Sequence, residues 1–163
     1  MKAAAADLMR RPRTSSHRAM AAAARAHPMD PLTAAQLGAA LGGLSEAAVL
    51  KREREGALFS VRRTARANAP EYPAFQAWPE VAGAPIKHVM QALAPLGATD
   101  LYGFFAAPTD LLGGLAPIEA LNGERAWNRW LGSEARMLLR SSMRVRLQAV
   151  LHAAGALVAL RAA

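Results

Sequence analysis

Apolar residues recur at three- and four-residue intervals along most of the chain, which is the spacing of helices with one buried face. The first such run follows residues 33–36, Thr-Ala-Ala-Gln, which have the sequence of a capping box. We expect a helix to begin there and to place Leu37, Ala40 and Leu41 on its inner face. The two glycines that begin at Gly42 predict its end.

A second short helix and two strand-like segments follow. Ser45 is the expected N-cap of a helix over residues 46–55, and Gly56 is the residue expected to end it. Two short helices joined by a tight glycine turn are typical of a helix-turn-helix. The apolar segments 58–61 and 72–76 predict two strands, with a polar, arginine-containing loop between them. A helix-turn-helix followed by such a hairpin has the layout of a winged helix.

The second half of the chain predicts further helices separated by turns. The connection at residues 78–85 contains proline and glycine and is the best candidate for a domain boundary. A turn-rich link is expected at residues 108–117. The expected helices are residues 86–93, a short helix capped by Thr99 or Asp100 with Leu101, Phe104 and Phe105 inside, residues 118–121 after Pro117, and residue 124 to about Leu160 with a break at Gly132-Ser133.

These elements predict a mainly α fold in three parts. We expect residues 1–31 to form an N-terminal tail and a short helix, the helix lying between Ser15 and His27. Residues 32–78 are expected to form a helix-turn-helix DNA-binding domain with a short, wing-like β-hairpin. Residues 85–163 are expected to form a C-terminal helical bundle domain, which binds a partner protein and contributes to dimerisation.

The charge of the chain favours an acidic partner. The formal net charge is +8, and all but three of the 20 basic residues are arginine, which suits contacts to phosphate and guanine. A GC-rich codon bias, which also raises alanine, explains the arginine excess equally well. Residues 1–76 hold 12 basic and 6 acidic residues, whereas residues 77–163 hold 8 and 6. The surplus therefore accompanies the predicted helix-turn-helix, as DNA binding requires.

The chain lacks residues that several kinds of site require. It contains no cysteine, which excludes disulfides, cysteine-bound zinc and thiol catalysis. Its four histidines are scattered, and no pair has the spacing of metal ligands. Asp110 and Glu119 are interpreted as helix-start residues rather than as an acid/base pair. We therefore expect no enzyme, no catalytic residue, no cofactor and no metal site.

Basic residues of the second predicted helix and of the following loop are the candidate DNA contacts. The small first turn of that helix permits close approach to a groove. A basic loop can lay arginines along the phosphate backbone or in a narrow minor groove. The alternatives are a solvated helix face, because Glu53 and Glu55 alternate with the basic residues, and an ordinary solvated loop. The candidates are Ser45, Lys51, Arg52, Arg54, Arg62, Arg63 and Arg66.

Two features of the predicted final helix indicate partners. Arg136, Arg140 and Arg144 recur every four residues, and like charges at that spacing repel, which suggests an acidic partner, although a solvated helix face explains the pattern at least as well. Residues 147–160 are apolar almost all round and must be buried in their own domain or against a second chain, which favours a homodimer. This stretch is shorter than the ~20 residues that span a bilayer, and no secretory signal is evident. We therefore expect a cytoplasmic protein without a membrane segment.

Three segments together resemble a known family. They are residues 54–61, residues 72–76 (Tyr-Pro-Ala-Phe-Gln), and residues 105–121, in which Leu-Gly-Gly is followed by Pro-Ile-Glu-Ala-Leu. The last resembles the core of the toxin-binding domain of Xre/MbcA/ParS-type antitoxins. The resemblance implies an antitoxin that binds promoter DNA through its helix-turn-helix and blocks the pocket of a RES-domain toxin, which consumes or transfers from NAD. By this resemblance the toxin-binding unit is shaped by Leu112, Gly113, Gly114, Pro117 and Ile118.

Three functions fit the sequence. The first is a DNA-binding antitoxin that neutralises a RES-type toxin and represses its own operon. The second is a stand-alone transcriptional regulator with no toxin partner. The third is a protein-interaction module without specific DNA binding, in which the charge serves solubility.

Overall fold

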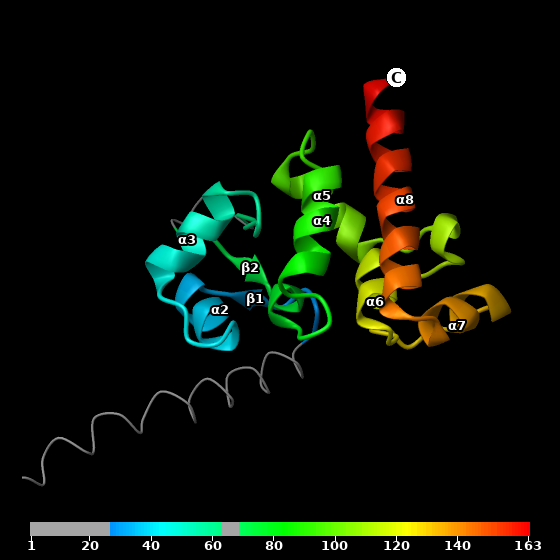
Figure 1. Ribbon diagram of the computed structural model, residues 1–163, viewed down its shortest axis with the longest axis horizontal. Coiled ribbons are helices and arrows are strands. Elements are labelled where there is room, and N and C mark those ends of the chain that lie inside the picture. The colour runs from blue at the N-terminus through cyan, green and yellow to red at the C-terminus, as the bar shows by residue number, and fades with distance from the viewer. Residues whose placement is uncertain (1–26, 63–68) are drawn as a thin grey trace, which may run out of the picture.

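The computed structural model describes residues 27–62 and 69–163. The predicted N-terminal helix, Arg63 and Arg66 lie outside the described residues. The described chain is mainly helical, with one small two-stranded antiparallel sheet (Figure 1). Its elements are β1 (Pro31–Leu32), α2 (Ala34–Ala40), α3 (Glu46–Arg54), β2 (Tyr72–Pro73), the 3-10 helix η1 (Ala74–Ala77), α4 (Ala84–Ala92), α5 (Ala98–Ala106), the 3-10 helix η2 (Asp110–Leu112), α6 (Pro117–Asn122), α7 (Ser133–Arg140) and α8 (Met143–Ala162).

The capping residues of α2 and α3 confirm the sequence prediction. Thr33 Oγ1 accepts a hydrogen bond from the Gln36 N–H at 3.2 Å, and Gln36 Oε1 accepts one from the Thr33 N–H at 2.8 Å. Ser45 Oγ accepts a hydrogen bond from the Ala48 N–H at 3.2 Å. The chain turns between the helices at Gly42, whose φ of +93° lies in the left-handed region.

Close contact at Gly38 fixes the turn between α2 and α3. A Cβ on Gly38 would lie 2.2 Å from the carbonyl oxygen of Leu44, so only glycine fits there. The Gly38 carbonyl also accepts hydrogen bonds from the N–H groups of Gly43 and Leu44, at 3.0 and 2.8 Å. The apolar core beneath this turn consists of Leu37, Ala40, Val49, Leu58, Tyr72 and Ala77.

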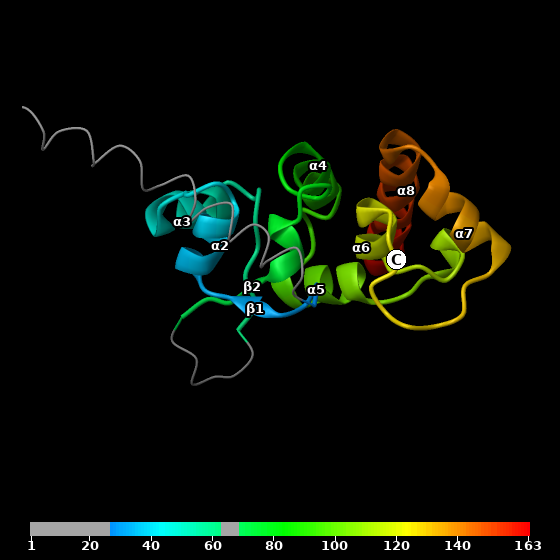
Figure 2. The same ribbon diagram turned by 90° about the horizontal axis from the view of Figure 1, so that it is seen from below.

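The hairpin predicted after α3 is wrong in its strand pairing. Val61 and Glu71 form an isolated bridge, through backbone hydrogen bonds of 2.8 and 3.2 Å. β2 pairs instead with β1, antiparallel (Figure 2). Pro31 lies opposite Pro73, and neither residue has an N–H to donate, so the ladder is limited to two residues on each strand.

Within the described residues, the segment after α3 has no neighbouring strand at Phe59, and a glutamine side chain forms the hydrogen bonds to its backbone instead. Gln76 in η1 accepts a hydrogen bond from the Phe59 N–H and donates one to the Phe59 carbonyl, each at 2.9 Å. The Phe59 ring stacks on Phe105 at a centroid distance of 5.8 Å, and Phe75 lies 4.9 Å from the same ring. This aromatic cluster connects the α2–α3 unit to the larger core formed by the rest of the chain.

α4 and α5 lie where the sequence predicts them. Ile86 and Val89 of α4 are buried, as the helical spacing requires. α5 differs at its first residue, because Gly97 is its N-cap and both Thr99 and Asp100 lie inside its first turn. The short α6 begins at proline and ends at glycine, as predicted.

The predicted long final helix is wrong, because it is two helices and residues 124–132 before them are not helical. Ser142 caps α8 with its side chain, and its extended backbone separates α8 from α7. Arg136 and Arg140 therefore lie on α7, whereas Arg144 lies on α8. The three arginines do not form one stripe on one helix.

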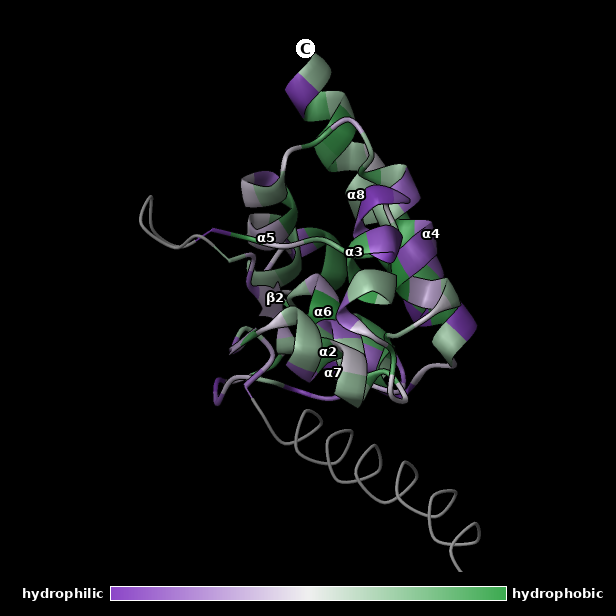
Figure 3. Cartoon of the chain, turned by 90° about the vertical axis from the view of Figure 1, so that its left-hand side faces the viewer, coloured by the Kyte–Doolittle hydropathy of each residue, from purple (hydrophilic) through white to green (hydrophobic). Residues whose placement is uncertain are grey.

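α8 is longer than the apolar tail predicted from the sequence. Its 20 residues are long and apolar enough, by length and composition alone, to cross a membrane, which corrects the expectation of a stretch too short to do so. Only 17% of its most apolar stretch is buried in the described chain. The exposed side of its first half carries Arg144, Gln148 and His152. Its last turns extend beyond the other helices, and hydrophobic residues predominate there (Figure 3).

Candidate nucleic-acid interface

Two hydrogen bonds orient α3 by holding its central acidic residue inward. Glu53 is half-buried and accepts a hydrogen bond from the Tyr72 hydroxyl at 2.6 Å. Its other carboxylate oxygen accepts one from the Ser60 hydroxyl at 2.5 Å. Both donors come from segments that pack beneath the helix. Glu53 therefore does not interrupt the basic outer face of α3, although its place in the sequence suggested that it would.

We define the outward face of α3 by Ala47, Leu50, Lys51 and Arg54, which are all exposed; Glu46 is exposed at its N-terminal edge, and Val49 is buried. The Arg54 guanidinium donates to the Leu50 carbonyl at 3.4 Å and remains accessible. Cationic side chains on such a face can contact phosphates and guanine edges. Leu50, whose side chain is 40% exposed, offers an apolar contact of the kind that thymine methyl groups accept.

Sequence reasoning missed Leu50 because a single leucine in a short helix is normally expected in the core. The signal that identifies it is its position around the helix: Leu50 shares one side with Glu46 and Arg54, and the buried Val49 lies about 100° away around the helix axis. Near the start of α3, Ser45 is exposed while its hydroxyl oxygen serves as the cap. Its hydroxyl hydrogen can donate to a neighbouring phosphate.

Arg52 lies apart from the outward face. It lines a shallow hollow of about 280 Å³ between α3 and the start of α4, together with Lys87 and Glu55. Lys51 forms a solvent-exposed ion pair with Glu55 at 3.8 Å, which contributes little free energy. Arg52 and Lys87 therefore provide a second basic position beside α3, and Lys87 is a candidate that the sequence did not indicate.

Of the predicted loop arginines, only Arg62 is described. It is exposed and directly follows Val61, which forms the bridge with Glu71 at the base of the loop. Arg63 and Arg66, the other two candidates of this loop, lie outside the described residues. The base of the loop is thus held by this bridge, next to β2 (Figure 2).

The residues that the antitoxin resemblance assigns to partner binding form a buried framework. Leu112, Pro117 and Ile118 are buried, and Gly113 and Gly114 make the turn between η2 and α6 with φ of +64° and +88°. A Cβ on Gly113 would lie 3.0 Å from the Ala135 nitrogen of α7, so this turn packs directly against α7. These five residues therefore determine the packing of the domain, and its exposed surface is formed by other residues.

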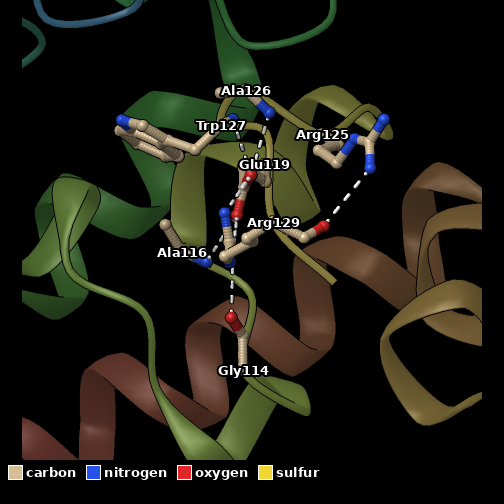
Figure 4. Close-up of polar contacts among 7 residues, drawn as sticks. All are labelled: Gly114, Ala116, Glu119, Arg125, Ala126, Trp127 and Arg129. Carbon is tan, nitrogen blue, oxygen red and sulfur yellow. Dashed lines mark hydrogen bonds and ion pairs between the residues drawn. The ribbon is translucent and has the colours of Figure 1, made fainter. Parts of the chain in front are cut away.

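A buried carboxylate organises the segment before α7 (Figure 4). Glu119 has no exposed surface and accepts hydrogen bonds from the N–H groups of Ala116 and Ala126, at 2.9 and 2.8 Å. Arg129 forms an ion pair with both of its oxygens and donates to the Gly114 carbonyl at 2.9 Å. Glu119 thus joins the start of α6 to residues 124–132. Asp110 and Glu119 do lie in the first turns of η2 and α6, as predicted.

These contacts determine the ionisation of Glu119. Burial opposes its charged form, but the hydrogen bond from Arg129, the two backbone N–H groups and the charge of Arg129 outweigh burial. The pKa of Glu119 therefore lies below its usual value. The carboxylate is ionised at neutral pH and acts as a structural anion, fully satisfied by its partners.

Beyond this anchor, the end of the molecule formed by α7 presents an exposed aromatic and basic surface. Trp130 is 84% exposed and Met137 is 68% exposed. Arg136 and Arg140, both exposed, line a shallow hollow of about 300 Å³ with Met137. Arg144 is also exposed, on α8. Tryptophan, methionine and arginine are the residue types enriched at protein interfaces.

Comparisons of the chain with protein-family models, with curated proteins and with solved structures found no match. Within the residues that the structure describes, no group of three or more histidine, aspartate or glutamate side chains could hold a metal ion. The arguments for the candidate sites therefore rest on the chemistry of the residues described above.

Proposed function

We propose that this protein is a DNA-binding antitoxin-type regulator, in which α2 and α3 form a helix-turn-helix and α3 is the recognition helix. The observation that carries the proposal is the outward face of α3, where Lys51 and Arg54 flank the exposed Leu50. The inward anchoring of Glu53 supports it, because that anchoring turns one acidic residue of α3 away from an approaching phosphate, while Glu46 and Glu55 stay exposed.

Phosphate contacts on both sides of α3 complete the proposed interface. Arg52 and Lys87 would contact the backbone on the α4 side. Arg62, with Arg63 and Arg66 further along the loop, would act as the wing and contact the backbone or the adjacent minor groove. Replacing Arg62 and Arg63 by alanine should then lower the salt dependence of DNA binding by about one unit per lost phosphate contact.

The second part of the proposal is a toxin-binding role for the C-terminal domain. Its support is the exposed surface of Trp130, Arg136, Met137 and Arg140, which lies at the opposite end of the molecule from α3 (Figure 1). A protein bound to DNA through α3 leaves this surface free for a partner. By the family resemblance the partner is a RES-domain toxin, and the proposed location is the cytoplasm, where both ligands are present.

The DNA-binding proposal is tested by a gel-shift of the purified protein on the DNA upstream of its own gene and on unrelated DNA, each at two salt concentrations. Specific complexes that survive physiological salt are expected. Weak binding to both DNAs that disappears as salt is added would indicate a nonspecific basic surface and would reject the regulator.

The toxin-binding proposal needs a separate experiment. The protein is co-expressed with a RES-domain toxin encoded beside its gene, and NAD is measured in the cells and with the purified complex. We expect a stable complex and protection of NAD, both lost on Trp130→Ala with Met137→Ala. Specific DNA binding without any such neighbour or complex would favour the stand-alone regulator instead.

A further inference from the structure

α5 and α8 enclose an open apolar groove that includes neither the outward face of α3 nor the exposed surface of α7. Its volume is about 420 Å³. The α5 wall includes Phe104, and Ala153, Ala156, Leu157 and Leu160 form the α8 wall. One end of the groove is marked by the ion pair between Asp100 and Arg161, whose nitrogen and oxygen are 2.8 Å apart.

The groove is continuous with the exposed apolar end of α8. Leu160 is 74% exposed, and Ala156 is exposed beside it. The C-terminal end of α8 extends beyond the other helices (Figure 1). An exposed apolar helix next to an open apolar groove of the same molecule favours an occupant that covers both.

We propose that the occupant is α8 of a second copy of this chain, packed antiparallel to the first in a two-fold symmetric dimer. Because α8 is both a wall of the groove and the exposed apolar element, each copy would fill the groove of the other. The contact is therefore closed and self-complementary, as a two-fold interface requires. This inference goes beyond DNA and toxin binding and does not depend on either.

The side-chain sizes on the α8 wall select the antiparallel arrangement. The wall consists of two alanines followed by two leucines, at positions 153, 156, 157 and 160, of which Ala153 is only 3% exposed. In an antiparallel pair centred between residues 156 and 157, Ala153 lies opposite Leu160 of the second copy, and Ala156 lies opposite Leu157 of the second copy. Each large side chain then meets a small one. A parallel pair would set leucine against leucine and alanine against alanine, with overpacking at one level and a void at another.

The absence of formal charge in residues 147–160 is compatible with insertion of α8 of the second copy into the groove. Residues 147–160 contain no aspartate, glutamate, lysine or arginine, so insertion into an apolar groove buries no formal charge of this segment at neutral pH. The antiparallel register brings His152 of the second copy to the end of the groove marked by Asp100 and Arg161. A polar side chain from the middle of one helix thus meets the polar end of the groove.

The mass of the protein in solution tests the proposal without DNA or toxin. Light scattering after size-exclusion chromatography, over a concentration series, should give twice the 17.3 kDa chain mass at high concentration. Ala156→Arg, which places a charge in the groove at an exposed position, should raise the dimer dissociation constant at least about tenfold. Gly155→Arg adds the same charge on the adjacent, open side of α8 and should leave the dimer unchanged. A monomer at every wild-type concentration, or equal loss in both variants, would overturn the proposal.

Cysteine cross-linking tests the register, because the natural chain contains no cysteine. His152→Cys and Leu160→Cys chains, which carry the cysteine at exposed positions that the antiparallel register brings close together, are treated with a short bismaleimide, separately and mixed. The mixture should cross-link much faster than either variant alone. Faster reaction of each variant with itself would indicate parallel helices and contradict the proposed arrangement.

A vesicle sedimentation assay tests the other candidate occupant of the exposed helix. Wild-type protein is mixed with phosphatidylcholine vesicles containing phosphatidylglycerol. We expect the dimer to remain in the supernatant, because its apolar α8 surface is covered. Monomeric protein that sediments with the vesicles would assign α8 to a lipid surface and would overturn the dimer.

Discussion

The Tyr72 hydroxyl donates a 2.6 Å hydrogen bond to Oε2 of Glu53 and so joins β2 to α3. Glu53 is the acidic residue between the basic residues of α3, and this bond holds it on the inner side of the helix. Lys51 and Arg54 are then left on the outer side with Leu50. The orientation of the proposed recognition helix thus depends on a tyrosine 19 positions away in the sequence.

Loss of this bond should weaken the folded state. Burial of the phenol first, and then its hydrogen bond to Glu53 and the charge of that carboxylate, raise the pKa of Tyr72. Tyr72→Phe should lower the free energy of unfolding by about 1.5–3 kcal/mol, as expected for a hydrogen bond to a charged group. Denaturant unfolding at pH 7 measures this change. Tyr102→Phe, in α5, controls for the loss of a tyrosine hydroxyl elsewhere.

The raised pKa of Tyr72 also determines the pH above which its hydrogen bond to Glu53 no longer stabilises the folded protein. An acid whose pKa is higher in the folded state contributes its full stability below its unfolded pKa of about 10, and loses it as the pH rises through the folded value. The unfolding free energy of the wild type should therefore fall above pH ~10 relative to Tyr72→Phe. Parallel curves for the two proteins would contradict the assigned hydrogen bond.

Gly38 should tolerate no side chain. Gly38→Ala would place a Cβ 2.2 Å from a backbone oxygen of the turn, so the turn between α2 and α3 must shift. We expect a loss of about 2–4 kcal/mol of unfolding free energy and weaker DNA binding. Gly103→Ala is the matched control, because it lies in a helix with nothing within 4 Å of the new Cβ. It should be neutral or stabilising by up to about 1 kcal/mol.

Local signals in the sequence predicted the helices that begin at caps and end at glycines. Thr33, Ser45, Pro117 and Gly123 each act within a few residues, so their effect can be judged without knowledge of the rest of the fold. The phase of α3 also follows from sequence, once Val49 is recognised as its core residue.

Contacts between segments that are distant in the sequence explain why the strand pairing and the helix over residues 124–132 were predicted wrongly. β2 pairs with β1 rather than with the segment after α3, in which the Gln76 side chain forms the hydrogen bonds to the backbone of Phe59. Residues 124–132 are held in an irregular path by the buried Glu119 and by Arg129. No periodic pattern shows such partners, so the structure was needed to add Trp130 and Met137 to Arg136 and Arg140, which the sequence had already indicated.

The ion pair between Arg129 and Glu119 should be essential for the C-terminal domain. Arg129→Ala leaves a fully buried carboxylate without its cation, which typically costs about 3–5 kcal/mol. Thermal and denaturant unfolding measure the loss. Arg125→Ala, which removes an exposed arginine from the same segment, should change the unfolding free energy by less than about 0.5 kcal/mol.

Acid should destabilise the same site. The pKa of Glu119 is lowered in the folded protein, so its contribution is fully present above the unfolded pKa of about 4.3 and is lost as the pH falls through the folded value. Glu119→Gln should be less stable at pH 7 and should lose less stability than the wild type between pH 5 and 3 (roughly the range set by the unfolded pKa). Identical pH profiles would show that Glu119 is not held as an anion.

The most direct test of the central claim compares two double variants that each remove two positive charges. Fluorescence anisotropy measures binding to the upstream DNA for Lys51→Ala with Arg54→Ala, and for Arg136→Ala with Arg140→Ala, at physiological salt. The α3 variant should lose at least about tenfold in affinity, as expected for two lost DNA contacts, while the α7 variant should bind like the wild type. Equal losses in both variants would show that net charge, rather than the outward face of α3, holds the DNA.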